Sequence, residues 1–75
     1  MSIDKKSAYR FKDFINQTFD NQTDAASFLN VSQGTISNFC NGKRSVPDRV
    51  LRSLAIRKNL NINWYFIGRG PMLSK

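Results

Sequence analysis

The sequence predicts a single all-α domain built from five short helices. Apolar residues recur at steps of three and four positions in five successive segments, as they do in helices with one buried face. Asn, Gly and Pro separate these segments, and no segment reads convincingly as a strand. A chain of 75 residues forms one domain and buries only about 60% of the surface that its unfolded state exposes, which leaves little room for an enclosed active site.

The first predicted helix runs from Ser7 to Phe19 and follows a polar N-terminal segment. Its apolar residues share one helix face: Phe11, Phe14, Ile15 and Phe19. We assign residues 1–8 to a polar tail that leads into this helix and residues 9–70 to the folded domain. Residues 71–75 are interpreted as a C-terminal tail or the start of a linker.

Residues 22–29 and 33–40 form the second and third predicted helices, and a sharp turn separates them. Asn21 is a suitable N-cap for the second helix, with Asp24 three residues later as in a capping box. Asn30 tolerates a left-handed backbone and can end that helix, while Ser32 is an N-cap candidate for the third. The residues expected to face inward are Ala25, Ala26, Leu29, Ile36 and Phe39.

A left-handed turn at Asn41-Gly42 and a short basic loop, Lys43-Arg44-Ser45, precede the fourth predicted helix. Pro47 fits the first turn of that helix, because its missing amide proton costs nothing there, and Asn59 ends it. Its apolar stripe consists of Val50, Leu51, Leu54 and Ala55. Asn61 caps a short fifth helix over residues 62–67, which is stopped by Gly68, Gly70 and Pro71.

The charge balance favours a polyanionic partner. Twelve Lys and Arg residues face five acidic residues, all Asp, which gives a net charge of +7. Such an excess is typical of domains that bind nucleic acid or an acidic membrane face. No apolar run approaches the roughly 20 residues that a membrane-spanning helix needs. We expect a nucleic-acid partner, with a charge that serves only solubility as the alternative, and neither a membrane nor a small-molecule partner. The expected location is cytoplasmic and nucleoid-associated.

Several classes of function find no support in the composition. The chain has one cysteine, Cys40, and no histidine, so it offers neither an internal disulfide nor a zinc site of the usual His and Cys ligands. It also contains no Glu, and no nucleophile–base or acid–base pair is recognisable. We expect no enzyme activity, no metal and no cofactor.

The segment over residues 22–42 has the geometry of a helix-turn-helix, whose second helix can enter the major groove, about 12 Å wide. The outward residues of this helix carry no charge: Gln33, Gly34, Thr35, Ser37 and Asn38. Gln and Asn side chains can form two hydrogen bonds with adenine. Gly34 costs about 1 kcal/mol relative to Ala within a helix, so close approach to DNA is one reason for its presence. The alternative interpretation is a plain polar surface.

These residues resemble the lambda-repressor-like helix-turn-helix family, of the Xre, Cro and CI type, which includes phage repressors and many bacterial regulators. The resemblance covers about residues 9–70. It rests on several marks in order and spacing: Gln22, Ala26, Val31-Ser32-Gln33, Ile36, Asn41-Gly42 and Asn63-Trp64-Tyr65-Phe66-Ile67-Gly68. The last mark is similar to the Asp-or-Asn, Trp, Leu, Leu, x, Gly ending of phage repressors. The resemblance implies a bundle with the helix-turn-helix at its second and third helices.

The resemblance also implies roles for individual residues. Base-contact positions would be Gln33, Gly34, Ser37 and Asn38, with Gln33 reading adenine and Gly34 offering no side chain for readout. Phosphate contacts would come from Gln22, Thr35, Asn41, Lys43 and Arg44, with Gln22 also supporting Gln33.

Two departures from the family pattern affect the predicted site. Asn30 replaces the usual glycine of the turn, which the geometry tolerates. Cys40 stands where the family often has a Glu paired with an Arg of the first helix, so Arg10 lacks that partner and becomes a candidate contact to the DNA backbone. Cys40 itself is interpreted as a small apolar residue, with a redox switch as the alternative.

The function predicted on this basis is transcriptional regulation by sequence-specific binding of double-stranded DNA, as by a phage or mobile-element repressor. A homodimer on a near-palindromic operator is expected, and the fifth helix, with Tyr65 or Phe66 left exposed, is one candidate for its surface. The competing hypothesis is a protein-interaction module, an antitoxin or an adaptor, built on the same fold. The Phe residues of the helices are expected to be core residues rather than base-stacking platforms.

Overall fold

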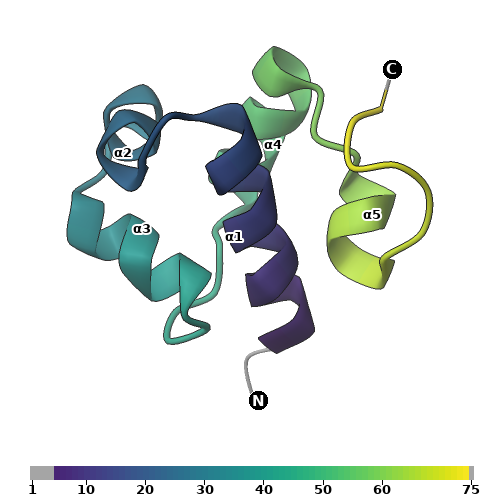
Figure 1. Ribbon diagram of the computed structural model, residues 1–75, viewed down its shortest axis with the longest axis horizontal. Helices are drawn as coiled ribbons and strands as arrows, with labels where there is room; N and C mark the ends of the chain where they lie inside the picture. The colour runs from purple at the N-terminus through teal and green to yellow at the C-terminus, as the bar shows by residue number, and fades with distance from the viewer. Residues whose placement is uncertain (1–4, 75) are drawn as a thin grey trace.

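A computed structural model describes residues 5–74 and shows an all-α fold (Figure 1). The described part of the chain contains five helices and no strand beyond an isolated bridge between Leu60 and Leu73. The helices are α1 (Lys5–Thr18), α2 (Gln22–Leu29), α3 (Gln33–Cys40), α4 (Asp48–Lys58) and α5 (Ile62–Ile67). The predicted fold class is therefore confirmed.

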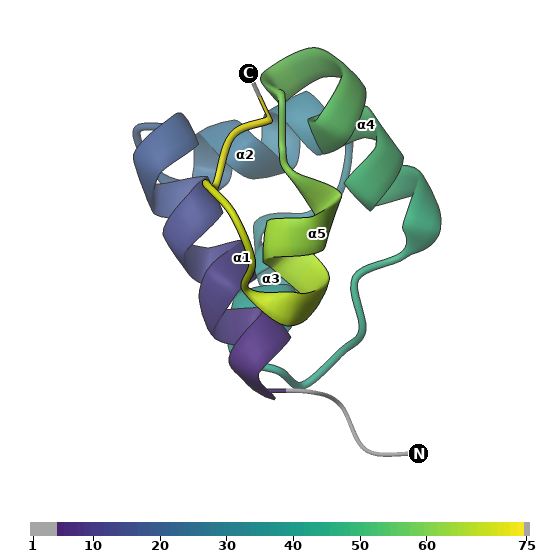
Figure 2. The ribbon, with the colours of Figure 1, turned by 90° about the vertical axis from the view of Figure 1, so that its right-hand side faces the viewer.

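Helix α1 lies in the middle of the molecule, with the α2–α3 pair on one side and α5 on the other (Figures 1 and 2). Its fully buried residues, Phe11, Phe14 and Ile15, supply the centre of the core. The ring of Phe11 packs edge-on against Phe39 of α3, with centroids 5.8 Å apart, and against Tyr65 of α5, at 6.5 Å. One aromatic side chain therefore links the two sides of the molecule.

Helix α1 begins earlier than the sequence pattern suggested. It starts at Lys5 rather than Ser7, and Ser7 and Ala8 are both buried. Residues 5–8, assigned to a polar tail, thus form the first turn of a packed helix, while residues 1–4 of that tail lie outside the described residues. The apolar pattern missed this turn because small side chains pack it, and these carry a weak periodic signal.

The predicted caps are confirmed at three helix starts. The side chains of Asn21, Ser32 and Asn61 each accept a hydrogen bond from a backbone N–H of the following turn. Asn30 and Asn59 both adopt the left-handed conformation, with φ of 59° and 61°, and end α2 and α4. These features depend on neighbouring residues only, which explains why the sequence revealed them.

Two caps differ in detail from the prediction. Asn41 at the end of α3 is right-handed, with φ of −93°, and Gly42 takes the left-handed position, with φ of +73°. Pro47 is the N-cap residue of α4 instead of a residue in its first turn, and it provides no side-chain cap. At the end of α3 the positive φ therefore falls on Gly42 rather than Asn41, and glycine adopts it without a steric cost.

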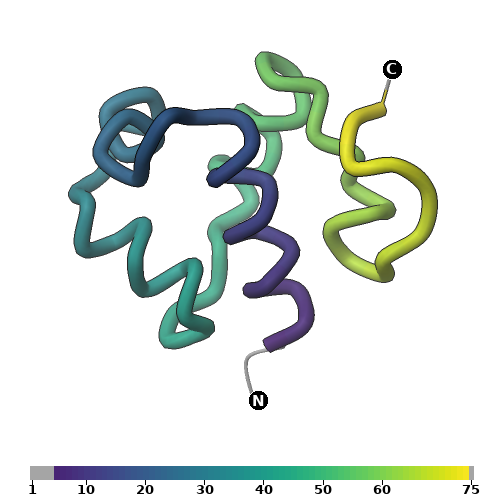
Figure 3. Tube along the Cα trace, viewed as in Figure 1, coloured from purple at the N-terminus to yellow at the C-terminus, as the bar shows by residue number. Residues whose placement is uncertain are grey.

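Residues 71–74 fold back onto the connection between α4 and α5 (Figure 3). The backbone N–H of Asn61 donates to the Met72 carbonyl at 2.9 Å, and the N–H of Ser74 donates to the Asn59 carbonyl at 2.8 Å. The Asn61 side-chain amide donates to the Pro71 carbonyl at 2.8 Å. The C-terminal residues thus hold the start of α5 in place.

Within the described residues, no helix is both long and apolar enough to cross a bilayer.

Candidate nucleic-acid interface

A tight corner between α2 and α3 sets the direction of α3. The left-handed Asn30 ends α2, and the N–H of Val31 donates to the Ala26 carbonyl at 3.0 Å. Ala26 and Ile36 are buried beneath the corner, and the half-buried Val31 packs against the same core. The small Ala26 side chain lets the two helices approach closely. The predicted helix-turn-helix arrangement of α2 and α3 is present in this geometry.

The start of α3 is fixed by a pair of hydroxyl groups. The Ser32 side chain accepts from the Thr35 N–H at 3.1 Å, and the hydroxyls of Ser32 and Thr35 lie 2.9 Å apart. Thr35 is half-buried. Its hydroxyl is therefore held near the N-terminus of α3, where a helix favours an anion.

The outer face of α3 carries the predicted reading residues. Gln33, Gly34 and Asn38 are exposed, and Ser37 is half-buried. No hydrogen bond among the described residues occupies the Gln33 or Asn38 amide. The Ser37 hydroxyl, in contrast, accepts from the Asn41 side-chain amide at 3.3 Å. The side-chain amides of Gln33 and Asn38 thus form no hydrogen bond among the described residues. The side chains of Ser37 and Asn41 are bonded to each other.

Gly34 is not required by packing within the protein. A Cβ atom at this position would meet only the Ser32 hydroxyl, at 3.9 Å, which is ordinary contact. The helix cost of this glycine, about 1 kcal/mol relative to Ala, is therefore not offset by any internal contact at its Cα. Packing among the described residues therefore gives no reason for a glycine at position 34.

Positive charge flanks the far end of this face. Lys43 and Arg44 are exposed in the loop that leaves α3, and the Lys43 N–H donates to the Asn38 carbonyl at 3.0 Å. This hydrogen bond ties the basic loop to the helix turn that carries Asn38.

Gln22 is half-buried at the first position of α2, and the described residues contain no hydrogen bond between its amide and Gln33.

Arg10 is engaged elsewhere. Its Nη1 donates to the Tyr65 carbonyl at 3.0 Å, in the last turns of α5. The glycine that ends α5, Gly68, lies so close that an added Cβ would stand 2.9 Å from Nη2 of Arg10. Because α5 and α3 lie on opposite sides of α1 (Figure 1), the hydrogen bond to α5 directs the Arg10 guanidinium away from the outer face of α3. We therefore leave Arg10 out of the candidate interface, contrary to the expected DNA-backbone contact.

Cys40 belongs to the core at the end of α3. It is buried and forms no disulfide, as its interpretation as a small apolar residue requires. Burial raises the pKa of its thiol, and the positive charge of Lys12 opposes that rise only in part. The thiol therefore stays protonated at neutral pH, and a low-pKa redox switch has no support in this geometry.

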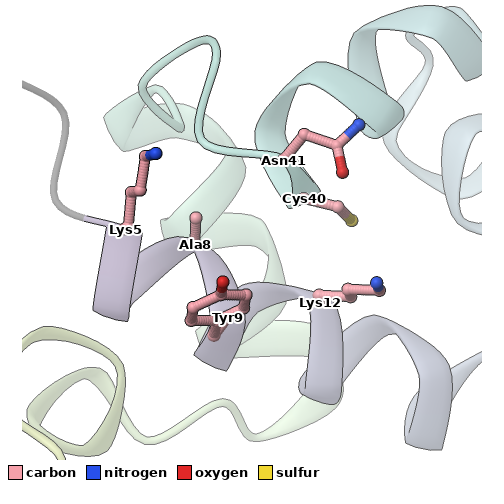
Figure 4. A pocket seen from close by; sticks show the side chains of 6 residues that line it. All are labelled: Lys5, Ala8, Tyr9, Lys12, Cys40 and Asn41. Carbon is pink, nitrogen blue, oxygen red and sulfur yellow. The ribbon is translucent and has the colours of Figure 1, made fainter.

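The structure brings a further set of polar side chains to the end of α3 that the sequence pattern did not place there. Lys5, Tyr9 and Lys12 of α1 line a small pocket together with Asn41 (Figure 4). These three residues recur at steps of four and three, as residues on one helix face do. This spacing would have revealed them if the start of α1 had been placed at Lys5.

Within residues 5–74 no group of His, Cys, Asp or Glu side chains is arranged to hold a metal ion.

Comparison of the chain with known proteins identifies no relative. No family model matches it, and neither the curated proteins nor the solved structures contain a significant match.

Proposed function

We propose that this protein is a sequence-specific, double-stranded-DNA-binding domain of the lambda-repressor-like helix-turn-helix type. One observation carries the proposal: the exposed face of α3 is polar but uncharged, and it stands at the end of a tight helix corner beside a basic loop. A face that served only solubility would more often carry Lys, Glu or Arg, which are better helix formers than Asn, Ser or Gly.

In this proposal α3 lies in the major groove. The open amides of Gln33 and Asn38 hydrogen-bond to base edges, and each can form a two-bond contact with adenine. Thr35, Asn41, Lys43 and Arg44 contact phosphates on the groove borders, which position the helix without reading sequence. Occlusion of a promoter by the bound domain would make it a transcriptional repressor, as in phages and mobile elements.

We also propose that the protein binds DNA as a homodimer. Phe66 and Ile67 of α5 are 53% and 60% exposed, although both are large apolar side chains, whereas Tyr65 is buried. Helix α5, which carries both residues, lies on the side of α1 opposite to α3 (Figure 1), so pairing through α5 leaves the exposed face of α3 open. A two-fold dimer would present two copies of α3 about 34–36 Å apart, which requires a near-palindromic operator.

The first experiment is selection of bound sites from a random duplex pool, followed by affinity measurements on the selected duplex. Gln33→Ala should weaken binding by roughly 1–3 kcal/mol and relax the preference at one base position. Gln17→Ala is the matched control, because Gln17 is an exposed glutamine on α1 outside the proposed interface. Lys43→Ala should weaken binding to all sequences alike.

Equal affinity of Gln33→Ala and the parent for every probe would refute the base-reading role of α3. Failure of the parent to bind any duplex at low salt would refute the proposed function as a whole. In that case the exposed Phe66 and Ile67 would favour the second candidate, a protein-interaction module such as an antitoxin or adaptor.

A further inference from the structure

The pocket between α1 and the end of α3 has an unusual lining. Lys5, Tyr9 and Lys12 project toward it from one side of α1, and Asn41 borders it from α3 (Figure 4). Ala8 and Cys40, both buried, complete the lining. Two lysines, a tyrosine and an asparagine therefore line a single hollow, and none of the residues that line it is acidic.

The size of the pocket restricts what can occupy it. Its volume is about 140 Å³. Pockets for organic ligands usually measure about 300–1,000 Å³, whereas one water molecule takes about 30 Å³. The pocket therefore fits a group of a few heavy atoms. Two lysines and a hydroxyl donor select an anion, and a phosphate group satisfies both conditions.

Gly42, in the loop that leaves α3, lies against Ala8 and Lys5 of α1. Gly42 has φ of +73°, and an added Cβ there would lie 3.5 Å from the Ala8 Cβ and 3.6 Å from the Lys5 Cγ. The loop after α3 thus rests directly on the first turns of α1. Lys5 therefore lies beside Gly42, the residue that precedes Lys43 in the chain.

The pocket also continues the polar face of α3. Asn41 lies four residues after Ser37 and seven after Gly34, so all three share one stripe of the helix. The hydrogen bond from the Asn41 amide to the Ser37 hydroxyl confirms this proximity. A helix that enters the major groove has the sugar–phosphate backbone at its ends. In the proposed complex, a sugar–phosphate backbone at the C-terminal end of α3 would pass beside Asn41 and therefore beside the pocket.

We propose that this pocket binds one phosphate of the DNA backbone, held by Lys5, Lys12 and the Tyr9 hydroxyl. The inference rests on the proposed DNA-binding function and adds an α1 contact to the interface. The competing explanation is intramolecular. Helix α3 has no basic residue in its last turn, and the two lysines could serve only to balance the negative end of its dipole.

The test compares two variants whose net charge is reduced equally. Lys5→Gln/Lys12→Gln removes the pocket lysines. Arg52→Gln/Arg69→Gln removes two exposed arginines outside the proposed interface, one of them in an exposed ion pair with Asp48. Affinity for the selected duplex is measured between low and moderate salt, and the melting temperature of each free protein is recorded as a structural control.

The pocket variant should bind about tenfold more weakly than the parent at moderate salt, with the same base preference. The slope of log affinity against log salt should become less steep by about 0.9 for each phosphate that the variant no longer neutralises. The control variant should keep a slope closer to that of the parent. This result, with similar melting temperatures for the two variants, supports the proposal.

Other results would overturn it. A parent-like slope in the pocket variant, combined with a lower melting temperature, would assign the lysines to the dipole of α3 and leave the proposed function intact. Tight binding of inorganic phosphate to the parent, with duplex binding unaffected by the lysine substitutions, would make the pocket a site for a free anion. Absence of any duplex binding by the parent would remove both this inference and the function on which it rests.

Discussion

The α2–α3 corner and the α5 side pack against opposite flanks of α1, and they are held in different ways. The corner is built from local hydrogen bonds, such as those of the Ser32 cap and the left-handed Asn30. The α5 side depends on contacts between residues far apart in the chain, such as the hydrogen bond from Arg10 to Tyr65, 55 positions away, and the returning residues 71–74.

The outer surfaces of the two sides differ as well. The exposed face of α3 is polar and uncharged, whereas α5 exposes the apolar side chains of Phe66 and Ile67. A surface with free amide groups suits a partner that is recognised by hydrogen bonds, and an apolar surface suits a protein partner. The two proposed contacts, with DNA and with a second copy of the chain, therefore lie on opposite sides of one helix.

The largest change in stability is expected from a substitution that removes the aromatic contact between the two sides. Phe11→Ala should destabilise the protein by about 3–5 kcal/mol, because the side chain is fully buried and packs against both Phe39 and Tyr65. Chemical denaturation followed by circular dichroism measures the change. If the destabilisation were below about 1 kcal/mol, Phe11 would not be the connection between the two sides.

A smaller effect should be confined to the α5 side. Gly68→Ala places a Cβ 2.9 Å from Nη2 of Arg10 at a residue whose φ is +73°, so it combines backbone strain with a disturbed hydrogen bond. We expect a destabilisation of about 2 kcal/mol. Amide hydrogen exchange should rise in α5 more than in α3. Faster exchange in α3 to the same extent would show that the two sides do not respond separately.

The smallest effect has the opposite sign and serves as the matched control. Gly34→Ala is the same substitution in a helical residue, where the added Cβ meets only the Ser32 hydroxyl at 3.9 Å. It should stabilise the free protein by up to about 1 kcal/mol, as measured by denaturation. The proposed function predicts that duplex affinity does not improve along with it. A gain in both stability and affinity would mean that Gly34 has no role at the DNA surface.

Local features of both sides could be predicted from the sequence. The caps at Asn21, Ser32 and Asn61 and the left-handed residues Asn30 and Asn59 all lie where the pattern placed them, because each depends on a few neighbouring residues. Most of the buried residues of α1 to α4 followed from apolar spacing for the same reason, whereas Phe19 and Ala55 of the predicted stripes are only half-buried.

Features that depend on distant residues were missed or misassigned. The partner of Arg10 could not be inferred, since Tyr65 lies 55 residues away and offers only a backbone carbonyl. Lys5 fell within an assigned tail, so its place beside Asn41 was not anticipated. Residues 71–74 contain no helical pattern, and their hydrogen bonds to residues 59 and 61 arise only once α4 and α5 are packed.

Short-range backbone geometry and residue chemistry specify the number of helices, most of their ends and the uncharged polar character of α3, so these could be derived from the amino acids alone. Long-range packing sets the side of α1 on which each polar group lies. It turned Arg10 toward α5 and gathered Lys5, Tyr9 and Lys12 at the end of α3. Both arrangements follow from the packing of α3 and α5 against α1, since a long side chain takes its direction from the helices that surround it.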